Sequence, residues 1–181
     1  MEHITLHDKT FKPFIPYGDI MAAIDKVADK MNNDFKDCED IPILLCVLNG
    51  SIMFTSELMK RLRFNCQLVS IKLTSYSGTS TTGKVKQAMG LTADITGRRV
   101  IIVEDIVDTG HTIVELKNIL KEKGASGCYV CTLLHKPEAC IKDLSLDYVA
   151  IPIPNKFIVG FGLDYNEIGR NLKDIYVLDE Q

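Results

Sequence analysis

A run of four apolar residues, Val100–Val103, is the strongest hydrophobic pattern in the chain, and two carboxylates, Glu104 and Asp105, follow it directly. A strand that is covered on both faces shows no alternation of apolar and polar residues, so this run predicts a fully buried strand. Shorter apolar segments predict further strands over residues 43–48, 67–73, 128–134, 148–151, 157–161 and 175–178.

Segments with apolar residues at helical spacing alternate with these strands. The first follows a breaker cluster of two prolines and a glycine at residues 13–18, and Asp19 is placed to cap a helix that continues to Met31. Two more helices are predicted over residues 51–62 and Thr112–Lys123. Strands that alternate with helices indicate an α/β fold with a mostly parallel sheet covered on both faces.

Length and composition limit the possible classes of function. The 181 residues fit one domain, and the net charge of -3 provides no basic surface for nucleic acid. No apolar stretch reaches the length of a membrane span, and the segment Met1–Lys9 lacks the continuous apolar core of a signal peptide. We therefore expect a cytoplasmic protein that binds neither nucleic acid nor membrane.

Two of the six cysteines, Cys128 and Cys131, have the spacing of a metal-binding or redox pair. They lie in a predicted strand, where residues i and i+3 point to opposite faces, so they are not placed to share a metal ion or a disulfide. We expect most of the cysteines to be small buried residues, as is typical in a reducing compartment.

The residues that follow the buried strand suit a phosphorylated sugar. Residues 108–112, which include two threonines and Gly110, predict a tight loop whose backbone N–H groups face an anion. The predicted helix behind this loop adds the positive end of its dipole. Glu104 and Asp105 offer carboxylates beside the loop, for sugar hydroxyls or for a metal ion.

The segment Val100–Thr112 resembles the phosphoribosyl-diphosphate (PRPP) binding motif of the type I phosphoribosyltransferases. This resemblance implies a single domain with a mostly parallel central sheet flanked by helices. It also implies a core of about residues 37–155, a small hood formed by residues 1–36 and 156–181, and a homodimer or homotetramer.

The resemblance also assigns roles within this motif. Glu104 and Asp105 would bind the ribose hydroxyls, directly or through metal-bound water. Asp108 would take the N7 proton of the purine and is the candidate catalytic residue. The residues implied to hold the 5′-phosphate are Asp108, Thr109, Gly110, His111 and Thr112.

Two other segments match loops of this family. Leu48, Asn49 and Gly50 resemble the loop that binds diphosphate and that often contains a cis peptide, here between Leu48 and Asn49. Family members commonly have Lys or Arg at the position of Asn49, so the resemblance implies a backbone role and no charge from this side chain. Ser75 and Tyr76 begin a segment rich in Ser, Thr and Gly that resembles the mobile loop over the reaction centre.

Five residues of the second half of the chain resemble base-binding, metal-binding and diphosphate-binding positions. Lys136 would donate to the exocyclic oxygen of the purine, Phe157 would stack on the base, and the backbone of Ile158 would hydrogen-bond it. Asp164 resembles a metal ligand, and Arg170 resembles a diphosphate contact.

These residues narrow the resemblance to the 6-oxopurine branch, the hypoxanthine and hypoxanthine-guanine phosphoribosyltransferases. The implied function is purine salvage, in which the phosphoribosyl group of PRPP passes to hypoxanthine or guanine and gives IMP or GMP and diphosphate. The implied cofactor is Mg²⁺, with Glu104, Asp105 and Asp164 as ligands. Two alternatives remain open: a phosphoribosyltransferase for xanthine or another base, and a regulator of the same fold that senses PRPP or nucleotides.

Overall fold

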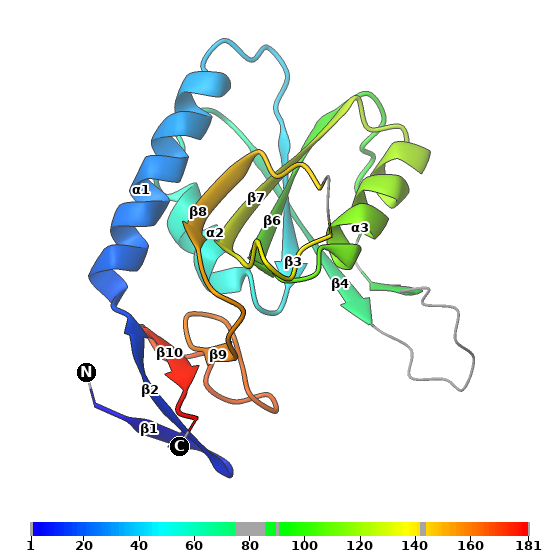
Figure 1. Cartoon of the computed structure of the whole chain (residues 1–181). Helices are drawn as coiled ribbons and strands as arrows, with labels where there is room; N and C mark the ends of the chain where they lie inside the picture. The colour runs from blue at the N-terminus through cyan, green and yellow to red at the C-terminus, as the bar shows by residue number, and fades with distance from the viewer. Residues whose placement is uncertain (1, 75–85, 90, 142–143, 181) are drawn as a thin grey trace.

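The computed structural model describes residues 2–74, 86–89, 91–141 and 144–180 and contains two β-sheets (Figure 1). The central sheet has six strands in the order β5-β4-β3-β6-β7-β8. Its strands are β3 (Ile43–Leu48), β4 (Gln67–Thr74), β5 (Lys86–Met89), β6 (Arg99–Val107), β7 (Gly127–His135) and β8 (Tyr148–Pro152). Neighbours in this sheet are parallel except for β5, which pairs antiparallel with β4 and which the sequence pattern does not predict.

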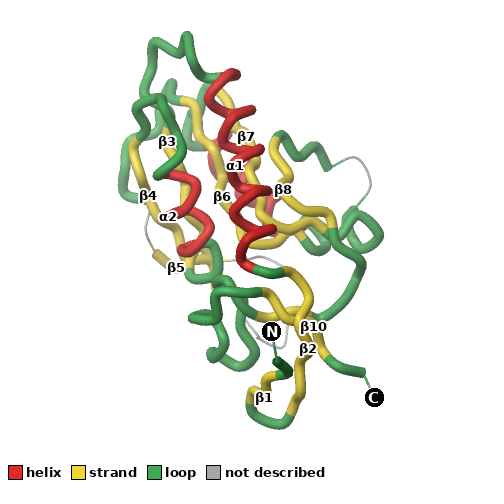
Figure 2. The backbone as a smooth tube through the Cα atoms, turned by 90° about the vertical axis from the view of Figure 1, so that its left-hand side faces the viewer, coloured by secondary structure: helices red, strands yellow, loops and turns green. Residues whose placement is uncertain are grey.

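Helices cover both faces of the central sheet. The helices α1 (Tyr17–Asp34) and α2 (Ile52–Met59) lie together on one face, and α3 (His111–Glu122) lies on the other (Figures 1 and 2). The predicted α/β fold with a mostly parallel sheet is therefore confirmed. Within the part of the chain that the structure describes, none of the helices has the length and apolar character needed to cross a membrane.

The apolar run in β6 is buried from both sides of the sheet. Ile101 and Val103 pack with residues of α1 and α2, whereas Val100 and Ile102 pack with residues of α3. All four side chains are fully buried. Burial on both faces explains why this strand shows no alternation of apolar and polar residues.

The neighbouring strand β7 separates the two cysteines in the same way. Cys131 belongs to the core on the α1 side, and Cys128 packs against the core on the α3 side. Both are free thiols. The prediction that they point to opposite faces is therefore confirmed.

The second sheet, which we call the hood sheet, combines the two ends of the chain. Its order is β1-β2-β10-β9, and its pairs are antiparallel. Its strands are β1 (Ile4–Leu6), β2 (Lys9–Ile15), β9 (Ile158–Val159) and β10 (Ile175–Leu178). Both termini lie beside this sheet in Figure 1. The helix α1 contacts β8 and α2, so it packs on the central sheet. The boundaries between core and hood that we expect near residues 36 and 156 stay predictions.

Strands β1 and β2 are missing from the sequence prediction, which placed Pro13 in a breaker cluster. Pro13 lies inside β2, opposite Tyr176 of β10. The strand β1 pairs only with Lys9–Phe11 of β2. At Pro13, β2 therefore has no neighbouring strand on the β1 side within the described part of the chain. A proline is tolerated there because its missing N–H removes no hydrogen bond from an interior ladder.

The cap of α1 also differs from the prediction. The helix begins at Tyr17, so Asp19 lies within the first turn and does not precede the helix. The N–H of Tyr17 donates instead to Oδ1 of the buried Asp174 at 2.7 Å. This carboxylate satisfies one of the N–H groups that lack a partner within the helix, and it joins the segment before β10 to α1.

We expect Asp174→Ala to lower the free energy of unfolding by about 1–3 kcal/mol, because the N–H of Tyr17 loses a charged, buried acceptor. Asp19→Ala should cost less than about 1 kcal/mol, because an exposed acid in the first turn interacts only with the helix dipole. Urea denaturation of the two variants measures the difference. Equal losses in the two variants would contradict the assignment of Asp174 as the cap.

Candidate active site

The predicted PRPP-binding residues and Lys136 gather at the carboxyl ends of three neighbouring strands, β3, β6 and β7. The loop 48–50 ends β3, residues 108–110 follow β6, and Lys136 follows β7. Because the three strands are adjacent and parallel, their carboxyl ends meet at one edge of the sheet. A cavity of about 290 Å³ lies at this edge. Its lining includes Leu48, Glu104, Asp105, Asp108, Thr109, Gly110 and Thr112.

Glu104 and Asp105 bring two buried carboxylates to this cavity, each less than a tenth exposed. Burial, together with the neighbouring Asp105, raises the pKa of Glu104 well above its usual value. Burial also raises the pKa of Asp105, although hydrogen bonds from Glu104 and from the N–H of Ile106 and, more weakly, the charge of Arg170 oppose this. Asp105 accepts from the N–H of Ile106 at 2.9 Å, whereas Oε2 of Glu104 has no partner among the described residues. The pair is therefore suited to a ligand that supplies hydroxyl donors or positive charge.

Gly110 shapes the predicted anion-binding loop at the start of α3. Its φ of 86° lies in the left-handed region, and a Cβ at this position would lie 2.4 Å from Cδ2 of Leu144. The backbone conformation therefore favours glycine, and a larger residue would also have to displace the side chain of Leu144. Behind the loop, the carbonyl of Thr109 accepts from the N–H of Ile141 at 3.0 Å. The first N–H groups of α3 have no acceptor within the helix, which makes this end a suitable anion site.

Lys136 and Asp108, to which the sequence analysis assigns separate roles, form an ion pair. Nζ of Lys136 lies 2.7 Å from Oδ2 of Asp108. The lysine side chain is 8% exposed and the aspartate side chain is 47% exposed, so the cation is buried and its partner faces the cavity. The register of β6 and β7, which pairs Val107 with His135, brings the two residues together. Adjacent parallel strands were the signal from which this contact could have been predicted.

The loop after β3, which is predicted to bind diphosphate, packs closely on Asp105 of β6 and on Gly162. The Leu48–Asn49 peptide is cis, as the resemblance implied. A Cβ at Gly50 would lie 1.7 Å from Oδ2 of Asp105, and a Cβ at Gly162, whose φ is 100°, would lie 2.1 Å from the carbonyl oxygen of Gly50. The sequence analysis assigned no role to Gly162, although a second glycine two residues before it marks this turn.

Protein groups already bind Asp164 on both oxygens. Oδ1 forms an ion pair with Nη2 of Arg170 at 2.5 Å, and Oδ2 accepts from the N–H of Glu167 at 2.7 Å. Nη1 of Arg170 also donates to the carbonyl of Gly162 at 2.7 Å. The described residues hold no group of three or more metal-ligating side chains. Asp164 pairs with Arg170 in the structure, and its assignment as a metal ligand together with Glu104 and Asp105 stays a prediction.

The base-binding candidates lie at the start of β9. Ile158 is buried and pairs with Val177 of β10. Phe157 is 44% exposed, so one part of its ring is free to meet a ligand. The two residues of the predicted mobile loop, Ser75 and Tyr76, lie outside the described residues.

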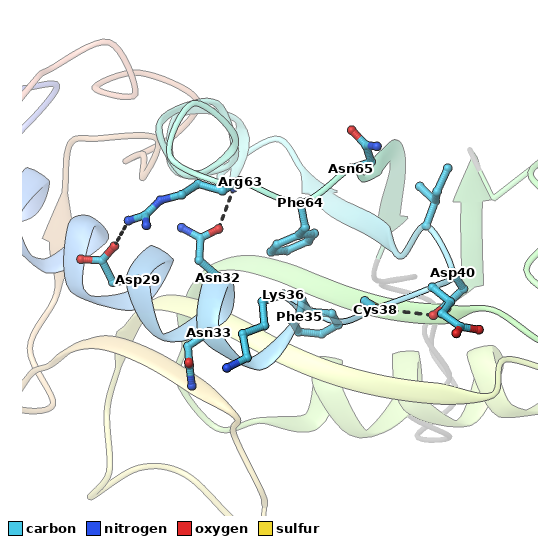
Figure 3. A pocket seen from close by; sticks show the side chains of 12 residues that line it. Asp29, Asn32, Asn33, Phe35, Lys36, Cys38, Asp40, Arg63, Phe64 and Asn65 are labelled. Atoms are coloured by element: carbon cyan, nitrogen blue, oxygen red, sulfur yellow. Dashed lines mark hydrogen bonds and ion pairs between the residues drawn. The ribbon is translucent and has the colours of Figure 1, made fainter.

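A second cavity of about 590 Å³ is larger but has no predicted site residue in its lining (Figure 3). Several of its polar groups are paired with one another. Arg63 forms an ion pair with Asp29, and Oδ1 of Asn32 accepts from the N–H of Arg63 at 2.7 Å. The smaller cavity, with its buried carboxylates and its glycine loops, is therefore the better candidate for the active site.

Comparison with known proteins agrees with this geometry. The sequence profile of the phosphoribosyl transferase domain matches residues 17–166. The hypoxanthine-guanine phosphoribosyltransferase of Streptococcus pneumoniae is 38% identical over 94% of both chains, and that of Streptococcus pyogenes is 40% identical over 91% of both. The solved hypoxanthine phosphoribosyl transferase of Trypanosoma cruzi superimposes with a TM-score of 0.87 at 31% identity, covering 97% of this chain and 95% of that one.

We expect Gly162→Ala to lower the free energy of unfolding by about 2–4 kcal/mol, because the methyl group meets a backbone carbonyl and the residue has a positive φ. Gly18→Ala is the matched control, since a Cβ at residue 18 meets nothing within 4 Å. That change should be neutral or slightly stabilising, because alanine favours the helix. Calorimetric unfolding compares the two variants, and a Gly162→Ala protein as stable as the control would contradict the close approach.

Proposed function

Because the chain belongs to the phosphoribosyl transferase family, we propose that it is a hypoxanthine-guanine phosphoribosyltransferase of purine salvage. In the proposed reaction, N9 of hypoxanthine or guanine attacks the anomeric carbon of PRPP. The new C–N bond forms as the bond to diphosphate breaks, and the bonding electrons leave with the diphosphate. The products are IMP or GMP and diphosphate.

The observation that carries the choice of base is the buried ammonium of Lys136. It has three N–H donors and no acceptor, and Asp108 takes one donor at 2.7 Å. A remaining donor suits the 6-oxo group of hypoxanthine or guanine. Adenine presents an amino donor at the same position, so it would place donor against donor. Xanthine also has the 6-oxo group and stays the closest alternative base.

Asp108 is the proposed acceptor of the proton that leaves N7 as N9 attacks. Its carboxylate is half-exposed toward the cavity and is held on one oxygen by Lys136. In guanine, N7 and the 6-oxo group lie on one edge of the base. The ion pair therefore offers an acceptor and a donor to that edge.

The remaining predicted residues would hold PRPP in place. The loop 108–112 would bind the 5′-phosphate through backbone N–H groups and threonine hydroxyls. The backbone of Leu48–Gly50 and the side chain of Arg170 would bind the diphosphate. Catalysis by this arrangement depends mainly on positioning and on charge stabilisation in a site that excludes water.

Mg²⁺ fits the two carboxylates of β6, Glu104 and Asp105. This ion prefers oxygen ligands and is commonly bound by one or two carboxylates together with substrate oxygens, so a cage of three carboxylates is not required. The unpartnered Oε2 of Glu104 supports this role. When bound, the ion neutralises charge on the leaving diphosphate. Asp164, which pairs with Arg170, is the third ligand that the resemblance implies.

We also propose a homodimer or homotetramer in the cytoplasm. The Trypanosoma cruzi structure addresses the role of the C-terminal region in the oligomeric state and activity of that protein. In the present chain the C-terminal segment is part of the hood sheet through β10.

A panel of bases tests the proposed function. The protein is incubated with PRPP, Mg²⁺ and one of hypoxanthine, guanine, xanthine, adenine or orotate, and both nucleotide and diphosphate are measured. We expect turnover with hypoxanthine or guanine, and no turnover after exhaustive chelation of divalent cations. Turnover with none of these bases, combined with tight PRPP binding, would favour a PRPP-sensing regulator.

We expect Asp108→Asn to lower kcat by about 100-fold or more, with a much smaller change in PRPP affinity. General acid–base catalysis contributes about 10²–10⁴-fold, and the amide preserves the shape of the loop. Steady-state kinetics and calorimetric titration of PRPP measure the two effects. A wild-type kcat in this variant would remove Asp108 from the proton transfer.

Lys136→Met should lower kcat/KM for hypoxanthine and guanine by about ten- to a hundredfold, since a charge-assisted hydrogen bond is lost while the apolar stem is kept. PRPP affinity should change little. Lys60→Met is the control, because Lys60 is an exposed lysine that pairs with Glu57 on the surface. Unchanged base kinetics in Lys136→Met would remove the main support for 6-oxopurine recognition.

A further inference from the structure

The ring of Phe157 is supported by two other aromatic rings of the hood. Its centroid lies 6.1 Å from that of Phe11 and 5.8 Å from that of Tyr165, and Tyr165 meets it edge-on at 84°. Phe11 is fully buried in the core of the hood sheet and forms a fixed support. Tyr165 is only half-buried in the loop after β9, so its position depends on the groups that hold it.

Tyr165 is held by residues of the turn between β1 and β2. Its hydroxyl donates to Oδ1 of Asp8 at 2.7 Å. This hydrogen bond lowers the pKa of Asp8 and raises the pKa of Tyr165, as expected for a phenol that donates to an ionised carboxylate. The His7 ring meets Tyr165 edge-on, with centroids 5.7 Å apart, and Nζ of Lys9 lies 5.7 Å from the centre of the Tyr165 ring.

These contacts join two tight turns from opposite ends of the chain. His7 in the first turn has a φ of 51°, and Asn166 and Glu167 in the second have φ values of 46° and 71°. Nε2 of His7 lies 3.2 Å from the carbonyl oxygen of Asn166. All four strands of the hood sheet lie together at the lower end of Figure 1. The N-terminal hairpin therefore contacts the loop that contains Tyr165 and restricts its movement.

We propose that Asp8 and Tyr165 are positioning residues for base binding, through which the β1–β2 turn holds the ring of Phe157 ready to stack on the purine. The consequence for base binding rests on the proposed function. A ring that is already fixed loses less conformational freedom when the ligand binds. Loss of the Asp8–Tyr165 hydrogen bond should therefore weaken base binding without affecting the PRPP loops or the proton transfer.

The kinetic test uses Asp8→Ala, Tyr165→Phe and the double variant that combines these two changes. Asp8→Asn is the conservative control. Each single variant should raise KM for hypoxanthine about three- to tenfold, the range expected for one loosened aromatic contact, with kcat and the KM for PRPP nearly unchanged. The double variant should be no worse than either single variant, because the same hydrogen bond is lost in all three. Asp8→Asn should remain near wild type, since its amide oxygen still accepts from the phenol.

Asp179→Ala is the matched control. Asp179 is another hood carboxylate, and it pairs with Lys12 at 2.8 Å instead of with the rings around Phe157. We expect no change in the KM for hypoxanthine in this variant. An equal rise in KM in Asp179→Ala and Asp8→Ala would show general loosening of the hood and would overturn the inference.

A second measurement does not depend on turnover. The chain contains no tryptophan, so Phe157→Trp places a single fluorescent reporter at this position. Time-resolved anisotropy should show a larger amplitude of fast ring motion when Asp8→Ala or Tyr165→Phe is added, and no change when Asp179→Ala is added. Unchanged anisotropy in Asp8→Ala and Tyr165→Phe would overturn the inference. If the wild-type protein turns over no base, the proposed function fails, and this measurement still decides whether Asp8 and Tyr165 hold residue 157.

Discussion

The close approach of Asp105, Gly50 and Gly162 is the constraint on which the geometry of the cavity depends. The carboxylate of Asp105 occupies the space where a side chain on residue 50 would begin, and the carbonyl of Gly50 occupies the equivalent space beside Gly162. The carbonyl of Gly162 in turn accepts from Arg170. A side chain on either glycine would separate the buried strand from the hood, because protein interiors have no free volume to absorb an extra methyl group. Arg170, which we expect at the diphosphate, is thus positioned relative to β6 through Asp105, Gly50 and Gly162.

The same packing leaves the cavity with an imbalance of charge. Glu104 and Asp105 are buried side by side, and burial raises the pKa of each carboxyl group. Burying a carboxylate oxygen without a donor costs free energy, which a ligand with hydroxyl groups and positive charge recovers when it binds. Hydrogen bonds offset part of this effect at Asp105, and the charge of Arg170 adds to them, while Oε2 of Glu104 keeps no partner among the described residues. The electrostatics of the protein alone therefore favour a ligand that combines a polyol with a cation, as PRPP and Mg²⁺ do in the proposed function.

The parts of the fold that local sequence could predict are those in which local and tertiary preferences agree. The run Val100–Val103 is buried on both faces, and its composition alone indicated this. Pro13 misled the prediction, because a proline is acceptable in β2 only where β1 has ended, and that depends on pairing between strands. The cap of α1 was missed for a similar reason, since Asp174 reaches Tyr17 from the other end of the chain. Spacing along the sequence has no information about such contacts.

In the candidate site, too, the sequence indicated which residues take part but not which of them contact one another. The motif resemblance selected Asp108, Lys136, Asp164 and Arg170, but it did not predict which of them would pair. Pairing follows from strand order for the first two and from a local turn for the last two. In the proposed reaction these pairings have different consequences. The Asp108–Lys136 pair presents an acceptor and a donor to one edge of a 6-oxopurine, so base recognition and proton transfer depend on the same contact. The Asp164–Arg170 pair instead keeps a guanidinium near the buried carboxylates, where it favours an anionic leaving group.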